Sequence, residues 1–332
     1  MAFALSDREG LSTMKFTVGV NVGGPHYDPA HIGAIARKAD EVGLHSVGAA
    51  ERLIMPRVIK SRYPRGSGAV PGVGSAQNTL EVLSVIGFLA GQTSRIRLMP
   101  FVVMPYRNPL LAAKMLATID VLSNGRLDIL LGVGWNREEA RALMVPTPFD
   151  KRGAVTNEYL RAFVELWNQE HPEFQGNYLQ ISDVDFAPKP VQRPHPPFWI
   201  GGESPAAIRR AARLGDGWSP GSANPQFPLD TTEQFTSAVA SLRRRAEAAG
   251  RDPHSIAIRF GSVTWSGGQA ETGPNGERMP FTGSAEQIAE DVRALAKLGV
   301  THMSVSTPAE SLAQELELLE SFATEVIPLA CA

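Results

Sequence analysis

The sequence predicts an α/β protein, a single (β/α)8 barrel of the TIM type, because short apolar runs alternate with longer segments of helical period. Eight such runs occur along the 332 residues. They are apolar throughout and do not alternate with polar residues, which is typical of parallel strands covered on both faces. Since the rhythm continues to the end of the chain, we expect one barrel domain over residues 15–332, after an N-terminal tail over residues 1–14.

The expected strands follow the apolar runs. They lie at residues 15–20, 45–49, 95–103, 127–131, 197–201, 217–220, 256–263 and 302–306. Insertions follow strand two (53–76) and strand seven (264–283), and an irregular stretch (168–196) precedes strand five. Both insertions leave the carboxyl ends of strands, the active-site face of such barrels, so we expect lids or substrate loops there. Plain surface insertions are the alternative.

Capping residues mark where several of the intervening helices begin. An Asx residue before proline is a typical helix start, and a Ser followed three residues later by Gln is a capping box. These signals stand at Asp28–Pro29, Asn108–Pro109, Ser284–Gln287 and Thr307–Pro308, the last of which we expect to begin the final helix.

Composition and charge exclude several classes of function. The net charge of −2 leaves no basic excess for a phosphate backbone, so we expect no nucleic-acid partner. No apolar run approaches the ~18 residues that span a bilayer, so we expect no membrane partner. A single cysteine, Cys331, and histidines without metal-ligand spacing argue against disulfides and metal sites. With no secretory signal visible, these features predict a cytoplasmic protein.

Two glycine-containing segments follow strands directly. The first, after strand four, comprises Gly132, Val133, Gly134, Trp135 and Asn136. Glycines there would let a flat ligand or a phosphate approach the backbone, but a tight strand–helix turn explains them equally well.

The second segment, after strand five, comprises Gly201, Gly202, Glu203, Ser204 and Pro205. It opens a helix whose first amide N–H groups could bind an anion, and the double glycine favours a phosphate site over an ordinary capped helix start. The arginines at positions 209 and 210 follow on this helix, and we expect them on its outer surface.

Charged and aromatic residues also stand at strand ends. Glu51 and Arg52 follow strand two, which makes them candidate site residues, although an ion pair at the rim is the alternative. Tyr106 and Arg107 lie between strand three and its helix, where Asn108 is mainly a helix cap.

Together these stretches resemble the luciferase-like monooxygenase superfamily, which comprises flavin and deazaflavin oxidoreductases on (β/α)8 barrels. The resemblance is carried by SVGAAERL, RIRLMPFVVMPYRNPLLAAKMLATIDVLSNGRLDILLGVGWNREE, FAPKPVQRPHPPFWIGGESPAAIRRAARLGDGWSP and GSAEQIAEDVRALAKLGVTHMSV. Within the superfamily, the chain is most similar to the branch that uses the deazaflavin coenzyme F-420 (8-hydroxy-5-deazaflavin).

The resemblance implies a role for individual positions. The cofactor phosphate would lie on the segment from Gly201 to Ser204, and the ribityl chain and ring against the segment from Gly132 to Trp135. Met99 and Pro100 would back the ring. Asn21 would lie under the cofactor, and Trp218 and Ser219 would form another wall. The expected cofactor-binding residues are therefore Asn21, Met99, Pro100, Gly132, Val133, Gly134, Trp135, Gly201, Gly202, Glu203, Ser204, Trp218 and Ser219.

Three residues are expected to be catalytic. Glu51 would donate or accept a proton, Tyr106 would stand behind it, and Arg52 would stabilise developing negative charge. Arg52 stands where many relatives carry a histidine that acts as a base on sugar phosphates, so that activity is disfavoured.

The resemblance implies hydride transfer between coenzyme F-420 and a small organic substrate bearing a C=C, C=N or alcohol/carbonyl group. An FMN-dependent monooxygenase that uses O2 is the alternative, and a non-catalytic flavin-binding barrel is an alternative of another class. Relatives are commonly oligomers, so we expect a homodimer or a larger homo-oligomer.

Overall fold

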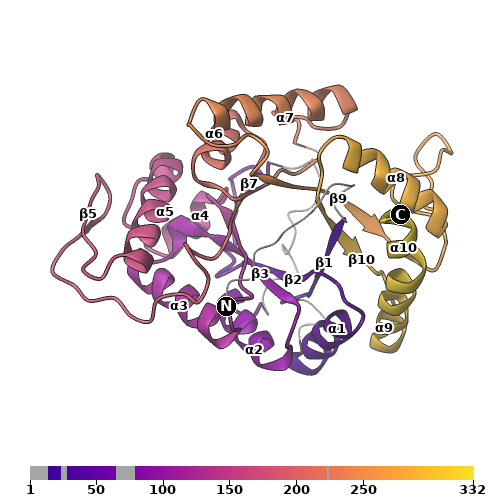
Figure 1. Cartoon of the computed structure of the whole chain (residues 1–332), viewed down its shortest axis with the longest axis horizontal. Coiled ribbons are helices and arrows are strands. Elements are labelled where there is room, and N and C mark those ends of the chain that lie inside the picture. Colours follow the sequence, from indigo (N-terminus) through magenta and orange to yellow (C-terminus); the bar gives the residue numbers. More distant parts are fainter. Residues whose placement is uncertain (1–13, 24–27, 65–78, 223) are drawn as a thin grey trace.

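A computed structural model of the chain describes residues 14–23, 28–64, 79–222 and 224–332. The tail expected at residues 1–14 and the first insertion, 53–76, therefore lie partly outside the described residues. Eight parallel strands close into a barrel in the order β1-β10-β9-β8-β7-β4-β3-β2, and helices surround it (Figure 1). The predicted (β/α)8 barrel is confirmed.

Each barrel strand coincides with one of the eight expected apolar runs. The strands are β1 (Lys15–Gly19), β2 (Ser46–Ala50), β3 (Arg97–Val103), β4 (Ile129–Gly132), β7 (Phe198–Gly201), β8 (Gly217–Ser219), β9 (Ala257–Thr264) and β10 (His302–Ser306). The irregular stretch before the fifth barrel strand contains only a short hairpin, β5 (Phe174–Gln175) with β6 (Gln180–Ile181).

Helices fill the connections between the strands. They are α1 (Pro29–Glu41), α2 (Val82–Gln92), α3 (Pro109–Leu122), α4 (Arg137–Ala142), α5 (Arg152–Asn168), α6 (Pro205–Leu214), α7 (Thr232–Glu247), α8 (Ala285–Lys297), α9 (Leu312–Ser321) and α10 (Ile327–Ala330). Short turns are η2 (Met104–Tyr106), η3 (Phe149–Lys151) and the π-helical η4 (Phe322–Val326). No helix in the described part of the chain has the length and apolar character needed to cross a membrane.

Most of the expected helix caps are confirmed. The side chains of Asp28 and Asn108 accept hydrogen bonds from N–H groups in the first turns of α1 and α3. Ser284 and Gln287 form the expected capping box of α8.

The expected start of the final helix at Thr307–Pro308 is wrong. Helix α9 begins at Leu312, where the Ser311 hydroxyl caps it by accepting from the N–H of Gln314. Thr307 is buried instead, and its hydroxyl has no hydrogen-bond partner among the described residues, so it caps nothing. A serine four residues further on competes for the same role, and sequence alone does not rank the two.

The barrel wall separates two apolar regions. Outward side chains such as Val47, Leu98 and Ile200 are buried against the helices in the main core. Inside the barrel a smaller cluster consists of Met99, Leu130 and Trp199, with Phe101 and Ala257 packed on it.

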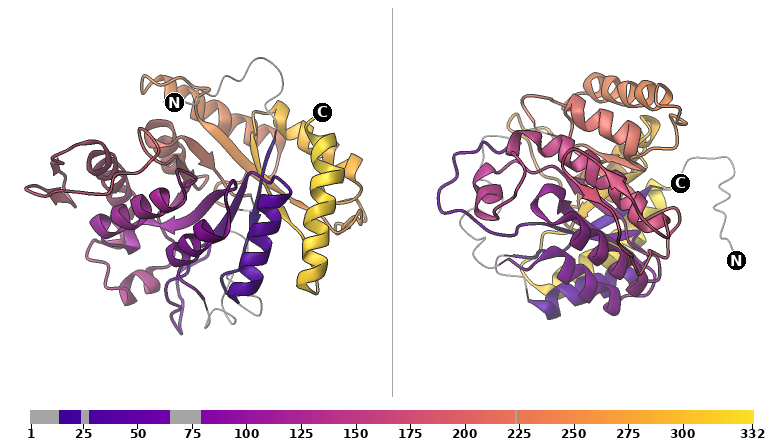
Figure 2. Two further views of the ribbon diagram at one scale, coloured as in Figure 1. Left: turned by 60° about the horizontal axis from the view of Figure 1, so that its bottom comes forward. Right: turned by 90° about the vertical axis from the view of Figure 1, so that its left-hand side faces the viewer.

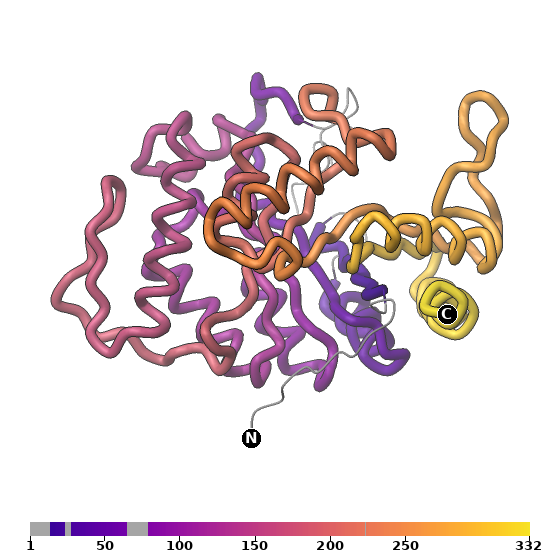
Figure 3. Tube along the Cα trace, turned by 45° about the horizontal axis from the view of Figure 1, so that its top comes forward, coloured from indigo at the N-terminus to yellow at the C-terminus, as the bar shows by residue number. Residues whose placement is uncertain are grey.

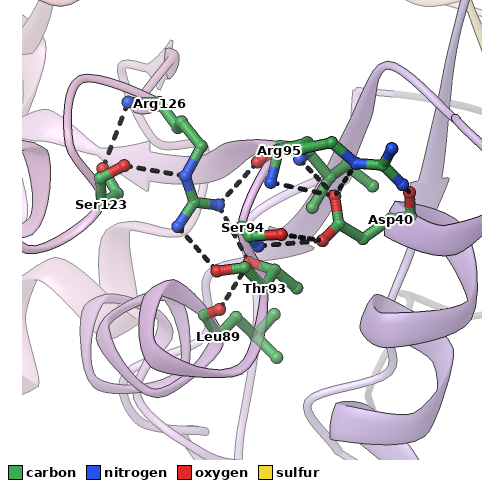
Figure 4. Close-up of polar contacts among 8 residues, drawn as sticks. Asp40, Leu89, Thr93, Ser94, Arg95, Ser123 and Arg126 are labelled. Atoms are coloured by element: carbon green, nitrogen blue, oxygen red, sulfur yellow. Dashed lines mark hydrogen bonds and ion pairs between the residues drawn. The ribbon is translucent and has the colours of Figure 1, made fainter.

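A polar network fixes the end of the barrel at which β3 begins (Figure 4). The Asp40 carboxylate at the end of α1 accepts hydrogen bonds of 2.7–3.0 Å from the three backbone N–H groups of residues 94–96. Burial raises the pKa of Asp40, but these bonds outweigh it and hold that pKa below its ordinary value. Arg126 donates to Thr93 Oγ1 at 2.9 Å and to the Ile96 carbonyl at 2.8 Å. This end is therefore held together by polar contacts, and the candidate site lies at the opposite end of the barrel.

Candidate active site

Two adjoining cavities open where the barrel strands end. The barrel-mouth cavity, about 600 Å³, lies over the barrel interior and is lined by residues of β1, β2, β3, β9 and β10 among others. The loop cavity, about 510 Å³, lies among the connections that follow β1, β2, β3 and β4. The two share lining residues, which are Val20, Asn21, Ala50, Phe101 and Gly201. They therefore form one continuous candidate site at the expected face of the barrel.

Small residues hollow out the barrel mouth. Gly19, Gly48 and Gly201 line it from three different strands. A Cβ atom at Gly19 would meet no heavy atom within 4 Å, so that position borders open space. At Gly48 and Gly201 a Cβ atom would instead lie 3.1 Å from a backbone carbonyl oxygen. At these three positions the backbone therefore borders the cavity with no side chain in between.

The floor of the barrel-mouth cavity is polar on one side. Arg259 on β9 donates to Ser304 Oγ at 2.6 Å and to Ser219 Oγ at 3.2 Å, and all three residues line the cavity. Across the barrel the floor is apolar, formed by Met99 and Leu130. A planar ring with one polar edge and one apolar edge would match this division.

Arg259 and Ser304 line the candidate site, and the sequence reasoning missed both. The description of every run as apolar throughout is wrong for β10, where polar residues at 302, 304 and 306 alternate with Met303 and Val305. Because side chains alternate across a strand, that pattern places one polar row inside the barrel.

Glu51 lies in the wall of the loop cavity with its side chain almost fully buried. Its carboxylate accepts a hydrogen bond from the Val103 N–H at 2.6 Å and is paired with Arg107, which also binds Glu81 at 2.5 Å. Burial raises the pKa of Glu51 to about 7, although Arg107 and the Val103 N–H oppose the rise. Burial therefore favours the protonated carboxyl more than is usual for a glutamate.

Arg52 forms an ion pair, as in the alternative interpretation, but its partner is Glu139, and Glu51 pairs with Arg107 instead. The Arg52 guanidinium lies 2.6 Å from Glu139 Oε2 and stacks over the Trp135 ring at 5.6 Å from the centroid. Tyr63 packs edge-on against the same ring. Arg52, Glu139, Trp135 and Tyr63 all line the loop cavity. Arg52 therefore forms an ion pair at the rim and also supplies a positive charge to the site.

Tyr106 supports the segment after β4. Its hydroxyl donates to the Asn136 carbonyl at 2.9 Å, and burial raises the pKa of the phenol above its ordinary value. Gly134 has a positive φ of 80°, and a Cβ atom there would lie 2.9 Å from Val103 and 3.0 Å from the Tyr106 hydroxyl. The segment Gly132–Trp135 therefore packs closely on Tyr106, and it lines the loop cavity as expected.

The double-glycine segment is only partly exposed to the site. Gly201 and Gly202 line the loop cavity, and the Gly202 N–H donates to the Ser219 carbonyl at 3.2 Å. Ser204 caps α6 by accepting from the Ala207 N–H. The Glu203 carboxylate is buried and bonded to the Gly221 N–H and the Asn224 amide. Glu203 and Ser204, both expected to contact the cofactor, thus line neither cavity.

Two further expected contacts also lie outside the cavities. Trp218 is fully buried beside Phe235, and its indole N–H donates to the Gly202 carbonyl at 2.9 Å. Pro100 is buried but does not line either cavity, because the alternation of β3 turns Met99 inward and Pro100 outward. Both residues pack behind the cavity wall, and neither faces the cavity.

The two insertions differ in their relation to the site. From the first, Tyr63 and Pro64 line the loop cavity, and residues 65–76 lie outside the described residues. No residue of 264–283 lines either cavity. That segment reaches away from the barrel (Figure 3), with a bridge between Thr272 and Arg278 and an ion pair from Arg278 to Asp291 of α8. The lid expected at residues 264–283 is therefore wrong, and the segment is a surface insertion.

Comparisons with known proteins agree with this architecture. A model of the luciferase-like monooxygenase family matches residues 11–272. The FMNH2-dependent dimethylsulfone monooxygenase of Pseudomonas putida is 32% identical over 184 residues, which are 55% of this chain and 48% of that enzyme. An uncharacterised protein of Mycobacterium tuberculosis is 33% identical over 229 residues, 68% of this chain and 77% of that protein.

A solved structure shares the fold. The coenzyme F-420 dependent tetrahydromethanopterin reductase of Methanopyrus kandleri superposes with a TM-score of 0.71, covering 95% of this chain and 99% of that one. Its sequence identity is 18%, so the likeness extends to the fold alone.

Proposed function

Because this chain belongs to the luciferase-like monooxygenase family, a family of flavin- or F-420-dependent oxidoreductases, we propose a specific reaction for it. The reaction is hydride transfer between coenzyme F-420 and a small organic substrate bearing a C=C, C=N or alcohol/carbonyl group. One observation carries the proposal, namely a buried carboxyl, Glu51, whose pKa burial raises to about 7, in the wall of the loop cavity that adjoins the barrel-mouth cavity.

The residues of the barrel mouth fit a flavin-type ring. The volume of about 600 Å³ lies within the ~300–1,000 Å³ usual for small-molecule sites. Gly19, Gly48 and Gly201 would flank the ring, Met99 would contact its apolar edge, and Arg259 would donate hydrogen bonds to its polar edge. Asn21, which lines both cavities, would stand between this ring and a substrate in the loop cavity.

Glu51 would supply the proton that hydride transfer requires. The cofactor, when bound, supplies or accepts the hydride. Hydride addition to a polarised double bond leaves an electron pair on the neighbouring atom, and a proton from the Glu51 carboxyl completes the reduction. Arg107 stabilises the carboxylate that remains, and Arg52 stabilises negative charge that develops on the substrate.

Anaerobic mixing with reduced coenzyme F-420 tests this proposal. In the presence of a panel of activated alkenes, imines and carbonyl compounds, we expect the absorbance of the oxidised deazaflavin to appear. Glu51→Gln is expected to lower kcat by about 10²–10⁴-fold while cofactor affinity stays within about threefold. Asp150→Asn, at an exposed carboxylate, is the matched control. If the wild-type chain shows no binding of reduced coenzyme F-420 and no spectral change, the proposal is refuted.

A second candidate is an FMN-dependent monooxygenase that uses O2. The named relative that carries this activity, at 32% identity, favours it. The same cavity residues would hold FMN, which shares the tricyclic ring with the deazaflavin. Oxygen consumption with reduced FMN, and no turnover of reduced coenzyme F-420, would establish this candidate in place of the first. Tight binding of either cofactor with no turnover over the whole panel would instead indicate a non-catalytic flavin-binding barrel.

A further inference from the structure

A cavity of about 460 Å³ lies outside the barrel, between α5 and α6, which are neighbours in the ring of helices (Figure 1). Four arginines from the two helices line it, and the rest of its lining is Gly, Ala, Asn and Leu. The arginines are Arg161, Arg209, Arg210 and Arg213. We call this feature the arginine groove. It shares no lining residue with the barrel-mouth or loop cavities.

The arginine groove lacks anionic partners. Among the described residues, none of the four arginines forms an ion pair with a carboxylate, and no acidic side chain lines the groove. Like charges gathered in one concave site repel one another and raise the local potential for anions. An anion in the groove would remove that repulsion.

Arg210 is held in place inside the groove. It is only 7% exposed, although the sequence suggested the outer surface. Its Nε donates to Asn157 Oδ1 at 2.6 Å and its Nη2 to the Gly153 carbonyl at 2.9 Å. Burial and the nearby Arg209 lower the pKa of Arg210 to about 10, so it remains charged at neutral pH. A buried cation bonded only to neutral acceptors is costly without a counter-charge, which indicates a binding role for the groove.

We propose that the arginine groove binds a small, multiply charged anion that bears phosphate groups, of which diphosphate is the simplest. Planar guanidinium groups donate paired hydrogen bonds to phosphate oxygens, and several arginines together match the charge of two linked phosphates. The lining offers no aromatic side chain on which a base could stack, so the phosphate groups themselves are the recognised feature.

Titration calorimetry with sodium diphosphate at constant ionic strength tests the proposal. The double variant Arg209→Ala/Arg213→Ala, which removes two exposed arginines, is expected to weaken diphosphate binding at least about tenfold. Arg244→Ala removes an exposed arginine of α7 and is the matched control, with binding within about twofold of wild type. Hydrogen exchange is expected to show protection on α5 and α6 when diphosphate is added.

Three outcomes would overturn the proposal. The first is binding that both variants weaken equally, which indicates general screening of charge. The second is protection confined to the strands of the barrel mouth, which means that diphosphate occupies the cofactor cavity. The third is absence of diphosphate binding while an acidic peptide binds, which makes the groove a protein-docking site. The arginine groove shares no lining residue with the two cavities of the candidate site, so diphosphate binding that persists in Gly19→Leu separates this test from the proposed function.

Discussion

At the scale of single residues, Glu51 shows how burial prepares a group for chemistry. Water is excluded from the carboxyl, which penalises the charged form, while Arg107 and one backbone N–H stabilise that form. Burial dominates, so the pKa is raised. A proton donor with a pKa near the working pH is the most effective kind, which links this local balance to the proposed reaction.

The raised pKa of Glu51 predicts a pH dependence of stability. Between pH 4.5, the ordinary value, and about 7, the folded chain binds a proton at Glu51 that the unfolded chain has released. The contribution of this group to stability is therefore complete below pH 4.5 and is lost as the pH rises through about 7. Urea unfolding of wild type and Glu51→Gln across this window should show the wild-type free energy of unfolding falling more steeply with pH. Parallel curves would contradict the raised pKa.

Sequence patterns identified some site residues and missed others for a physical reason. Glu51 and Gly201 directly follow strands, and the end of a parallel strand is always at the same face of the barrel. Arg259 lies within a strand, where an inward polar residue is indistinguishable in sequence from an interruption of the strand. The partner of Arg52, Glu139, lies 87 residues away, and only the folded chain brings the two together.

At the scale of elements, the start of α9 yields a paired prediction. Ser311→Ala removes the cap and should lower the free energy of unfolding by about 1 kcal/mol. Thr307→Val removes a buried hydroxyl that has no partner among the described residues, so it should be neutral or slightly stabilising. Urea denaturation of both variants measures the difference. Loss of about 1 kcal/mol in Thr307→Val, with Ser311→Ala neutral, would place the helix start at Thr307.

The open space beside Gly19 on β1 yields a second prediction at this scale. A Cβ atom there meets no heavy atom within 4 Å and the backbone is not left-handed, but a leucine side chain would extend into the barrel mouth. Gly19→Leu should therefore fold with stability close to wild type and bind FMN and coenzyme F-420 at least about tenfold more weakly. Gly91→Leu on the exposed side of α2, where a Cβ also meets nothing within 4 Å, is the matched control in the fluorescence titration. Unchanged affinity in Gly19→Leu would place the cofactor elsewhere.

At the scale of the whole molecule, the barrel depends on contacts between the two ends of the described chain. Strand β1 pairs with β10, and α1 lies beside α9 (Figure 2), where Lys38 forms an ion pair with Glu320. Behind these strands the ring of Phe16 meets Phe322 edge-on at 5.1 Å, and both rings are buried.

This closure predicts a global effect from a residue far from the cavities. Phe322→Ala should lower the free energy of unfolding by about 3–5 kcal/mol, because it leaves a hole between β1 and the last helices. Urea denaturation followed by circular dichroism measures the effect. A loss below about 1 kcal/mol would contradict a stabilising role for the contact between Phe16 and Phe322.

The sequence predicts the (β/α)8 barrel more completely than it predicts the residues of the candidate site. A regular alternation of strand and helix constrains the whole chain at once, and each of the eight runs contributes to the same conclusion. The course of insertions is not constrained in this way. The segment after β9 is fixed by its own Thr272–Arg278 bridge and by Asp291 of α8, which the alternation does not encode.

A crystal structure of the chain with FMN or coenzyme F-420 bound tests the central claim most directly. We expect the tricyclic ring in the barrel mouth between Gly19, Gly48 and Gly201, with a polar edge within hydrogen-bond distance of Arg259. A ring bound outside this cavity, or one turned with its polar edge toward Met99 and Leu130, would contradict the account.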